Sequence, residues 1–159
     1  IILKNYASII SKMQNAVGPN TVGPNTVGPN AVGPSVTIIT ITQYSRRECL
    51  RNLSMLIQAQ VYKNIIEWII VEGTRDRANS IKNSTLINEL KERIPIIRLI
   101  DGHSGQSLSD LRNAGNDASR GDIIVCMDDD DYYPPTRVSH AVYVLQSQSA
   151  ALIAGCSRA

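Results

Sequence analysis

The most informative segment of the chain reads Ile123-Ile124-Val125-Cys126-Met127-Asp128-Asp129-Asp130-Asp131, and Tyr132-Tyr133-Pro134-Pro135 follows at once. The apolar run has the length and composition of a buried β-strand. Adjacent carboxylates repel one another and raise each other's pKa unless a positive group lies beside them. A divalent cation with oxygen ligands is the usual neutralising partner. We therefore expect a buried strand with a cation site at its carboxyl end.

On both sides of this segment, strand-like runs alternate with helical patterns. Apolar runs predict strands over residues 36–42, 65–71, 96–100, 122–127 and 150–156. Apolar residues at helical spacing predict helices over residues 45–60, 83–93 and 135–146, and a further helix that begins at Leu108 and ends near Gly121. Ser45 and Glu48 have the spacing of a capping box, which predicts that the first of these helices begins at Ser45. Strands without polar alternation, separated by helices, indicate a parallel sheet covered on both faces.

Polar residues follow three of the predicted strands. Thr42-Gln43-Tyr44 comes after the first strand, Glu72-Gly73 after the second, and the four aspartates after the fourth. Ligands of such sheets bind at the carboxyl ends of the strands. We therefore expect these three loops to converge on one edge of the sheet.

The N-terminal part has a different composition. Residues 1–16 carry apolar side chains at helical spacing, so we expect a helical segment there. The triplet Val-Gly-Pro then recurs with a period of five residues from Val17. Frequent glycine and proline disfavour helix and sheet, which predicts a linker or loop over residues 17–35. The globular domain is expected over residues 36–159.

Composition limits the classes of protein that the chain can belong to. With 159 residues, 43% hydrophobic and 19% charged, it has the profile of one soluble globular domain. A net charge of +2, with no basic cluster longer than Arg46-Arg47, gives no support for nucleic-acid binding. No apolar run approaches the ~20 residues that span a membrane. Three cysteines lack metal-site spacing and favour a reducing compartment, so we expect a cytoplasmic protein.

Residues 109–131 resemble family 2 glycosyltransferases of the GT-A fold. That family has an Arg-Asn-x-Gly helix, here residues 112–115, then Gly-Asp, here residues 121–122, and an apolar strand that leads to a DxD-type motif. The first strand and a helix carrying Leu50-Arg51 and residues 58–60 also match, so the resemblance extends from Val36 to about Ala154. It implies a Rossmann-like α/β fold with a mostly parallel sheet and helices on both faces. We expect this GT-A domain to be truncated at its C-terminus.

The resemblance also implies a binding site for a donor nucleotide. Residues 40–44 would line the base, and Arg112 would lie near the base or the diphosphate. Glu72 stands where the family often has an aspartate that contacts the base. The implied donor-binding residues are Thr42, Tyr44, Glu72, Arg112, Asp128 and Asp129.

Within the acidic run, the resemblance implies a division of roles. Asp128 would accept hydrogen bonds from ribose hydroxyls, and Asp130 would bind the Mn²⁺ or Mg²⁺ that bridges the two phosphates. Four consecutive aspartates leave the register open by one residue, so Asp129 and Asp131 are alternates for the metal ligand. A UDP-sugar is the favoured partner, and the acceptor is an unidentified sugar, lipid or protein.

The implied function is metal-dependent transfer of a sugar from a nucleoside-diphosphate sugar to an acceptor, with inversion at the anomeric carbon. The family's catalytic base lies well downstream of the DxD motif, so we expect it beyond Ala159. One alternative is a non-catalytic nucleotide-sugar-binding or scaffold module. Another is a nucleotidyltransferase, which would carry a glycine-rich basic loop after the first strand. The loop here, residues 43–47, contains no glycine, and this disfavours the second alternative.

Overall fold

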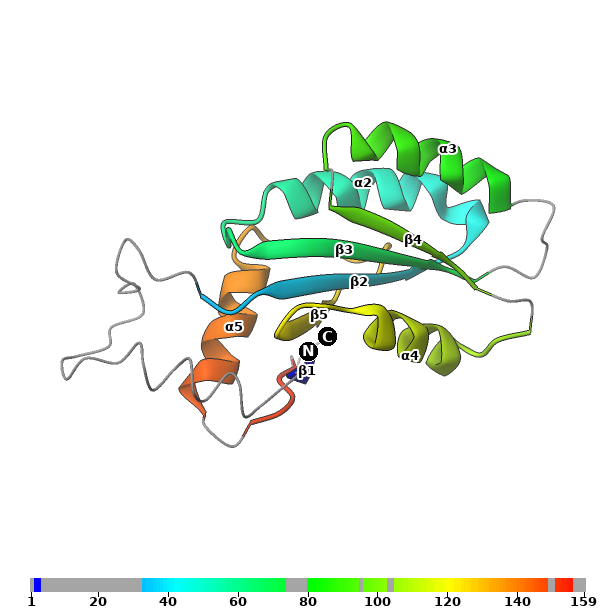
Figure 1. The fold of residues 1–159 in the computed structure, drawn as a ribbon. Helices are drawn as coiled ribbons and strands as arrows, with labels where there is room; N and C mark the ends of the chain where they lie inside the picture. The colour runs from blue at the N-terminus through cyan, green and yellow to red at the C-terminus, as the bar shows by residue number, and fades with distance from the viewer. Residues whose placement is uncertain are drawn as a thin grey trace.

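The computed structural model describes residues 2–3, 33–73, 80–94, 96–102, 105–148 and 151–155. A five-stranded sheet with the strand order β1-β5-β2-β3-β4 forms its centre (Figure 1). The strands are β1 (Ile2–Leu3), β2 (Val36–Thr42), β3 (Ile65–Glu72), β4 (Ile97–Asp101) and β5 (Ile123–Cys126). All pairings among β2, β3, β4 and β5 are parallel, and only β1 is antiparallel to its neighbour β5. The predicted α/β fold with a mostly parallel sheet is therefore confirmed.

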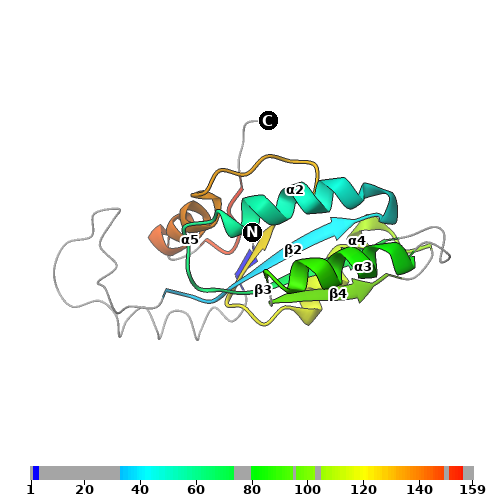
Figure 2. The same ribbon diagram turned by 90° about the horizontal axis from the view of Figure 1, so that it is seen from above.

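Helices cover both faces of this sheet (Figure 1). Helices α2 (Arg47–Gln58) and α3 (Ser80–Lys91) lie side by side on one face (Figure 2), and α4 (Leu108–Ala118) covers the other. Helix α5 (Arg137–Ser147) packs into the same apolar cluster as α2 and α3. Ile38 and Trp68 point into that cluster, whereas Ile39 and Ile69 point into the cluster beneath α4. Among the helices that the structure describes, none is long and apolar enough to cross a membrane.

Two predicted elements at the ends of the chain differ from the structure. The strand expected over residues 150–156 is wrong for the described part, since residues 151–155 contain only a single bridge residue, Ile153. Leu152 and Ile153 are 53% and 70% exposed, unlike the side chains of a strand in a covered sheet, whereas Ala151 and Ala154 pack against the larger apolar cluster. In the N-terminal segment, Ile2 and Leu3 form β1 rather than helix. The rest of that segment and the repeat up to residue 32 lie outside the described residues.

The predicted capping box at the start of α2 is also wrong. Residues Tyr44–Arg46 form a tight 3₁₀ turn, closed by a 2.9 Å bond from the Arg46 amide to the Gln43 carbonyl. The α-helix begins only at Arg47, and its N-cap residue, Arg46, makes no side-chain capping bond. The extra turn moves the N-cap past Ser45 and frees the side chain of Arg46 for other contacts.

The Gly-Asp pair before β5 has a structural role at the amino end of the sheet. A Cβ on Gly121 would lie 2.5 Å from the backbone nitrogen of Thr37, so only glycine allows this approach to β2. Asp122 accepts bonds from the amide and the hydroxyl of Ser35 at 2.9 and 2.8 Å. The Asp122 amide in turn donates to the Ser35 hydroxyl at 3.0 Å. These bonds join the start of β5 to the start of β2, at the opposite edge from the aspartates.

Tyr62, in the connection between α2 and β3, provides a test of this packing. Its hydroxyl donates a 2.7 Å bond to the Pro34 carbonyl, and burial raises the pKa of Tyr62 to about 12, with a further contribution from the negative charge of Asp122. The Tyr62→Phe variant should lose about 1 kcal/mol of unfolding free energy at pH 7, because one hydrogen bond is removed. Because the pKa of Tyr62 is higher in the folded state, the neutral hydroxyl contributes to the free energy of unfolding. This contribution is complete below the pKa of the unfolded chain, about 10, and is lost as the pH rises towards 12.

The difference in stability between the wild type and Tyr62→Phe should therefore shrink above pH 10. Urea unfolding of both proteins between pH 7 and 11.5 measures it. An undiminished difference at the highest pH would contradict the assignment.

Candidate functional site

The loops after the parallel strands meet at one edge of the sheet, as predicted. Thr42, Glu72 and Asp101 are paired in register at the ends of β2, β3 and β4. One residue further on, the Gly73 amide bonds to the Thr42 carbonyl at 2.9 Å, and the Gly102 amide bonds to the Glu72 carbonyl at 2.8 Å. On the other side of β2, the Met127 amide bonds to the Ile39 carbonyl at 3.0 Å and leads the chain into the acidic run.

Asp129 is the buried member of the acidic run. Its side chain is 2% exposed. The Thr42 hydroxyl donates a 2.6 Å bond to Oδ2, and a guanidinium nitrogen of Arg46 lies 3.0 Å from Oδ1. Burial raises the pKa of Asp129, and the bond from Thr42 and the charge of Arg46 oppose that rise. A buried carboxylate needs such donors, so Thr42 and Arg46 are the groups that hold the acidic run against the sheet.

Asp130 points the opposite way, with a side chain that is 59% exposed. The same nitrogen of Arg46 that contacts Asp129 lies 2.7 Å from Oδ2 of Asp130. This bond lowers the pKa of Asp130 below its usual value and raises the pKa of Arg46. One guanidinium therefore bridges two neighbouring carboxylates, one buried and one open to solvent.

Tyr133 shapes the rest of the acidic loop. Its hydroxyl accepts a 2.6 Å bond from the Asp128 amide and lies 3.3 Å from Oδ2 of Asp131, to which it donates. The side chain is buried, which raises its pKa, and the charges of Asp131 and Asp128 raise it further. The neutral phenol thus folds the loop back on itself between Asp128 and Asp131.

Helix α4 brings Arg112 to the same edge. Ser107 and Asp110 form a capping box at its start, with reciprocal bonds of 3.2 and 2.9 Å between side chain and backbone. A guanidinium nitrogen of Arg112 lies 3.8 Å from Oδ1 of Asp128, and the two side chains are 46% and 49% exposed. Arg112 and Asp128 therefore form a loose, solvent-facing pair beside the bridged aspartates.

The far end of the acidic loop is attached to α2 through Gln60. The amide nitrogen of this buried side chain donates 2.9 and 3.1 Å bonds to the carbonyls of Pro134 and Leu56. Its oxygen accepts a 3.0 Å bond from the Val138 amide, in the first turn of α5. Gln60 thus satisfies backbone groups on both sides and sets the distance between α2 and the acidic loop.

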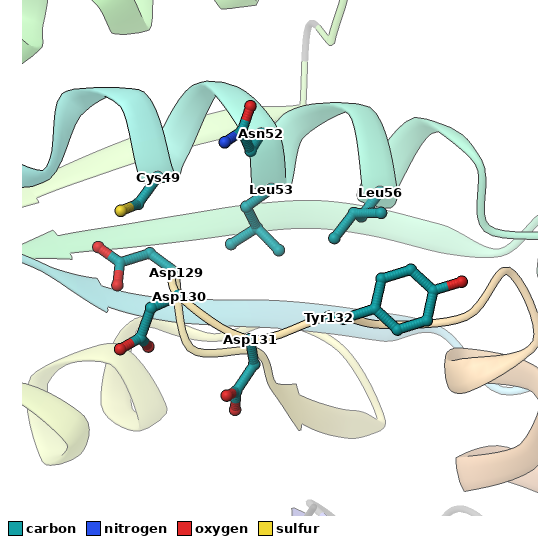
Figure 3. Close-up of a pocket in the computed structure, with 8 residues that line it drawn as sticks. All are labelled: Cys49, Asn52, Leu53, Leu56, Asp129, Asp130, Asp131 and Tyr132. Carbon is teal, nitrogen blue, oxygen red and sulfur yellow. The ribbon is translucent and has the colours of Figure 1, made fainter.

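A cleft of about 300 Å³ lies between α2 and this loop (Figure 3). One wall is mainly apolar and the other is mainly acidic. The lining residues are Cys49, Asn52, Leu53, Leu56, Asp129, Asp130, Asp131 and Tyr132. Within the described residues, no group of three or more His, Cys, Asp or Glu side chains converges in a way that could hold a metal ion. A cation in this region would therefore need ligands from elsewhere, such as phosphate oxygens.

The structure thus brings together Thr42, Arg112 and the four aspartates, and places Tyr44 in the same 3₁₀ turn as Arg46. Glu72 is at the same edge but is only 1% exposed.

Sequence reasoning missed Arg46 as a site residue. The available signal was a basic residue in the loop between the first strand and its helix, but nothing in the sequence indicates contact with residues 83 and 84 positions away.

Comparison with known families identifies the chain. The model of the family described as "Glycosyl transferase family 2" matches residues 38–159, which is most of the sequence. This chain belongs to glycosyl transferase family 2. The resemblance seen in the sequence is thereby confirmed, and family membership excludes the nucleotidyltransferase alternative. Comparison with curated proteins gave no match.

Solved structures show the same GT-A fold. The mannosyltransferase PcManGT from Pyrobaculum calidifontis, solved in complex with GDP-Man and Mn²⁺, is similar with a TM-score of 0.61 at 18% identity, over 86% of this chain. TarS from S. aureus is similar with TM-scores of 0.54 for the 1–349 structure and 0.57 for a second structure, at 17% and 14% identity, each over 71% of this chain. The glycosyltransferase chain described here spans 37% of PcManGT and 32% and 20% of the two TarS chains.

The bond between Thr42 and Asp129 can be tested by the nearly isosteric variant Thr42→Val. Without the 2.6 Å donor, the buried carboxylate is left partly unsatisfied, and unfolding free energy at pH 7 should fall by about 1–3 kcal/mol. Burial already raises the pKa of folded Asp129, and loss of the bond should raise it further, so the deficit should be largest at neutral pH, shrink as the pH falls through these raised values and be smallest by about pH 4. Denaturant unfolding at both pH values measures this. Thr42→Ser keeps the hydroxyl and is the control; equal losses in both variants would contradict the role of the bond.

Gly115 explains the glycine of the Arg-Asn-x-Gly helix. A Cβ there would lie 2.8 Å from Cγ2 of Ile39 and 3.2 Å from Cγ2 of Val71, so α4 sits close to the sheet only because the residue is glycine. The Gly115→Ala variant should gain about 1 kcal/mol in helix propensity and lose about 1–3 kcal/mol through overpacking. We expect a net loss of stability by denaturant unfolding, and a displacement of Arg112 from Asp128 in a crystal structure. Asp117→Ala, at an exposed position on the same helix, is the control. A stabilised Gly115→Ala protein would show that the space between α4 and the sheet can accommodate a Cβ.

Proposed function

We propose that this family 2 glycosyltransferase binds a nucleoside-diphosphate sugar at the carboxyl edge of its sheet and transfers the sugar to an acceptor with inversion. The observation that carries the proposal is the alternation of the acidic run. Asp129 is buried against Thr42, while Asp128 and Asp130 face solvent beside Arg112 and Arg46. The exposed carboxylates could bind sugar hydroxyls and a cation, and the two guanidinium groups could bind phosphates.

The proposed roles follow from exposure. Asp128, half exposed, would accept hydrogen bonds from ribose hydroxyls, and Arg112 would lie against the diphosphate. The hydroxyl of Thr42 is engaged by Asp129, so we assign Thr42 to positioning that carboxylate rather than to contact with the base. Tyr44, in the same turn as Arg46, is the proposed base-lining side chain, and the buried Glu72 would form the floor of the base site.

A divalent cation fits the residues present if the donor completes its shell. Mg²⁺ and Mn²⁺ take oxygen ligands and commonly use one or two carboxylates together with substrate phosphates. Asp130 is the proposed ligand because it is exposed, whereas Asp129 is buried and Asp131 is hydrogen-bonded by Tyr133. When bound, the cation would neutralise charge that develops on the diphosphate leaving group. The structure of PcManGT with GDP-Man and Mn²⁺ supports this proposal for a chain of the same fold.

The identity of the donor and the source of the base belong to the same proposal. We favour a UDP-sugar, as the family resemblance implied, with GDP-mannose as the competing donor because PcManGT was solved with it. The base that deprotonates the acceptor hydroxyl would be a carboxylate downstream of Ala159, where the family carries it. The acceptor would be a sugar, a lipid or a protein, and the residues at this edge of the sheet do not distinguish among the three.

Calorimetric titration with UDP-sugars and GDP-mannose, with and without Mn²⁺, tests the proposal. We expect Mn²⁺ to tighten donor binding at least tenfold. Asp130→Asn should abolish the metal-dependent part of the affinity, because it removes the exposed carboxylate ligand, while Asp131→Asn should reduce it less. Asp117→Asn, on the solvent side of α4, is the matched control. Equal donor affinity with and without Mn²⁺ would contradict the assignment of a metal ligand. A larger effect of Asp131→Asn than of Asp130→Asn would show that Asp131 is the ligand.

A further inference from the structure

We infer that Arg46 is the resident counterion of the acidic run and competes with the divalent cation for Asp130. The inference rests on the proposed function, since it concerns loading of the same edge. A single guanidinium nitrogen lies 3.0 Å from Oδ1 of Asp129 and 2.7 Å from Oδ2 of Asp130. The carboxylate proposed as the metal ligand is thus paired with a positive charge that the chain itself supplies.

The competition follows from charge and space. A nitrogen at 2.7 Å occupies the side of the Asp130 oxygen that faces Asp129, and two positive groups on one carboxylate repel each other. A cation at Asp130 must therefore push the guanidinium away or accept a longer, weaker bond. The neighbouring basic residue shows that this position is specific: Arg47 pairs with Glu89 on α3 at 3.6 Å and not with an aspartate of the run.

The two halves of the bridge differ in how easily they separate. The Asp129 carboxylate is 2% exposed and would be left underpaired without Arg46, whereas the Asp130 carboxylate is 59% exposed and can be solvated by water. Arg46 is itself 35% exposed and lies at the N-cap of α2, outside the regular helix. Arg46 can therefore leave Asp130 by rotating its side chain while it stays paired with Asp129.

Once it has left Asp130, the guanidinium would still pair with Asp129 and could donate further hydrogen bonds to the donor diphosphate, which offers it bidentate acceptors. Binding of the cation and of a nucleoside diphosphate would then help each other, since the phosphates give Arg46 a partner in exchange for Asp130. In the absence of nucleotide the site should bind a cation weakly, and the nucleoside diphosphate should raise that affinity. Arg46 thus couples metal loading to the presence of donor, which makes it a positioning residue of the proposed reaction.

The test measures Mn²⁺ binding alone, by the electron paramagnetic resonance signal of free Mn²⁺, in the full chain without nucleotide. Arg46→Gln should bind Mn²⁺ about twofold to fivefold more tightly than the wild type, in line with loss of a partly exposed ion pair. Arg46→Lys, which keeps the charge without the planar fork, should fall between the two. Arg47→Gln removes the same charge one residue away and should leave the affinity unchanged. Adding UDP should tighten Mn²⁺ binding more in the wild type than in Arg46→Gln.

Two further measurements distinguish a failure of the proposed competition at Asp130 from a failure of the proposed metal role. On the Asp130→Asn background, Arg46→Gln should no longer raise Mn²⁺ affinity; a gain that persists there would overturn the competition at Asp130. In the wild type, Mg²⁺ should shift the Nε–H resonance of Arg46 and not that of Arg47, and this holds even if Arg46→Gln folds poorly. Equal Mn²⁺ affinity of a folded Arg46→Gln protein and the wild type overturns this inference alone. Absence of Mn²⁺ binding in every protein, with and without UDP, overturns the proposed metal role and this inference with it.

Discussion

Burial of the Asp129 carboxylate is the constraint on which the geometry of the site depends. A carboxylate that is 2% exposed is stable only with donors in contact, and those donors are the last residue of β2 and the N-cap residue of α2. With Asp129 held inward, its neighbours Asp128 and Asp130 are directed to solvent. The difference in exposure among these chemically identical residues is therefore set by the contacts of Asp129 with Thr42 and Arg46 and not by their sequence.

Residues of the family motif divide into those that build the frame and those that face the site. Gly115 lets α4 approach the sheet, Gly121 lets the start of β5 approach β2, and Gln60 joins α2 to the loop before α5. None of these three presents a group to the open edge. Arg112, Asp128 and Asp130 do present such groups, and they stand where the frame places them. A change in the frame can thus alter donor binding without touching a ligand.

The fold could be predicted from the sequence because its signals are local and repeated. The β-branched run 36–42 matches β2 residue for residue, and the helix predicted from Leu108 begins where α4 does but ends at Ala118 instead of near Gly121. The strand predicted from the apolar run 150–156 is wrong for residues 151–155, where Leu152 and Ile153 are exposed and Ile153 is a single bridge residue. In the site, the aspartates and Thr42 were predictable from their place after strands. Arg46 was not, because its two partners are more than 80 positions away and the turn that frees it was read as a helix cap.

By itself, the sequence determined the class of fold, the edge of the sheet that carries the site and the family. Apolar runs without polar alternation require a sheet buried on both faces, and parallel strands bring their carboxyl ends to the same edge. Only the tertiary structure decided which aspartate is buried, which is exposed and which arginine lies between them. The physical reason is that local periodicity is a property of consecutive residues. The pairing of charges depends on the distance between Thr42, Arg46 and Asp129, which only the packed helices and strands define.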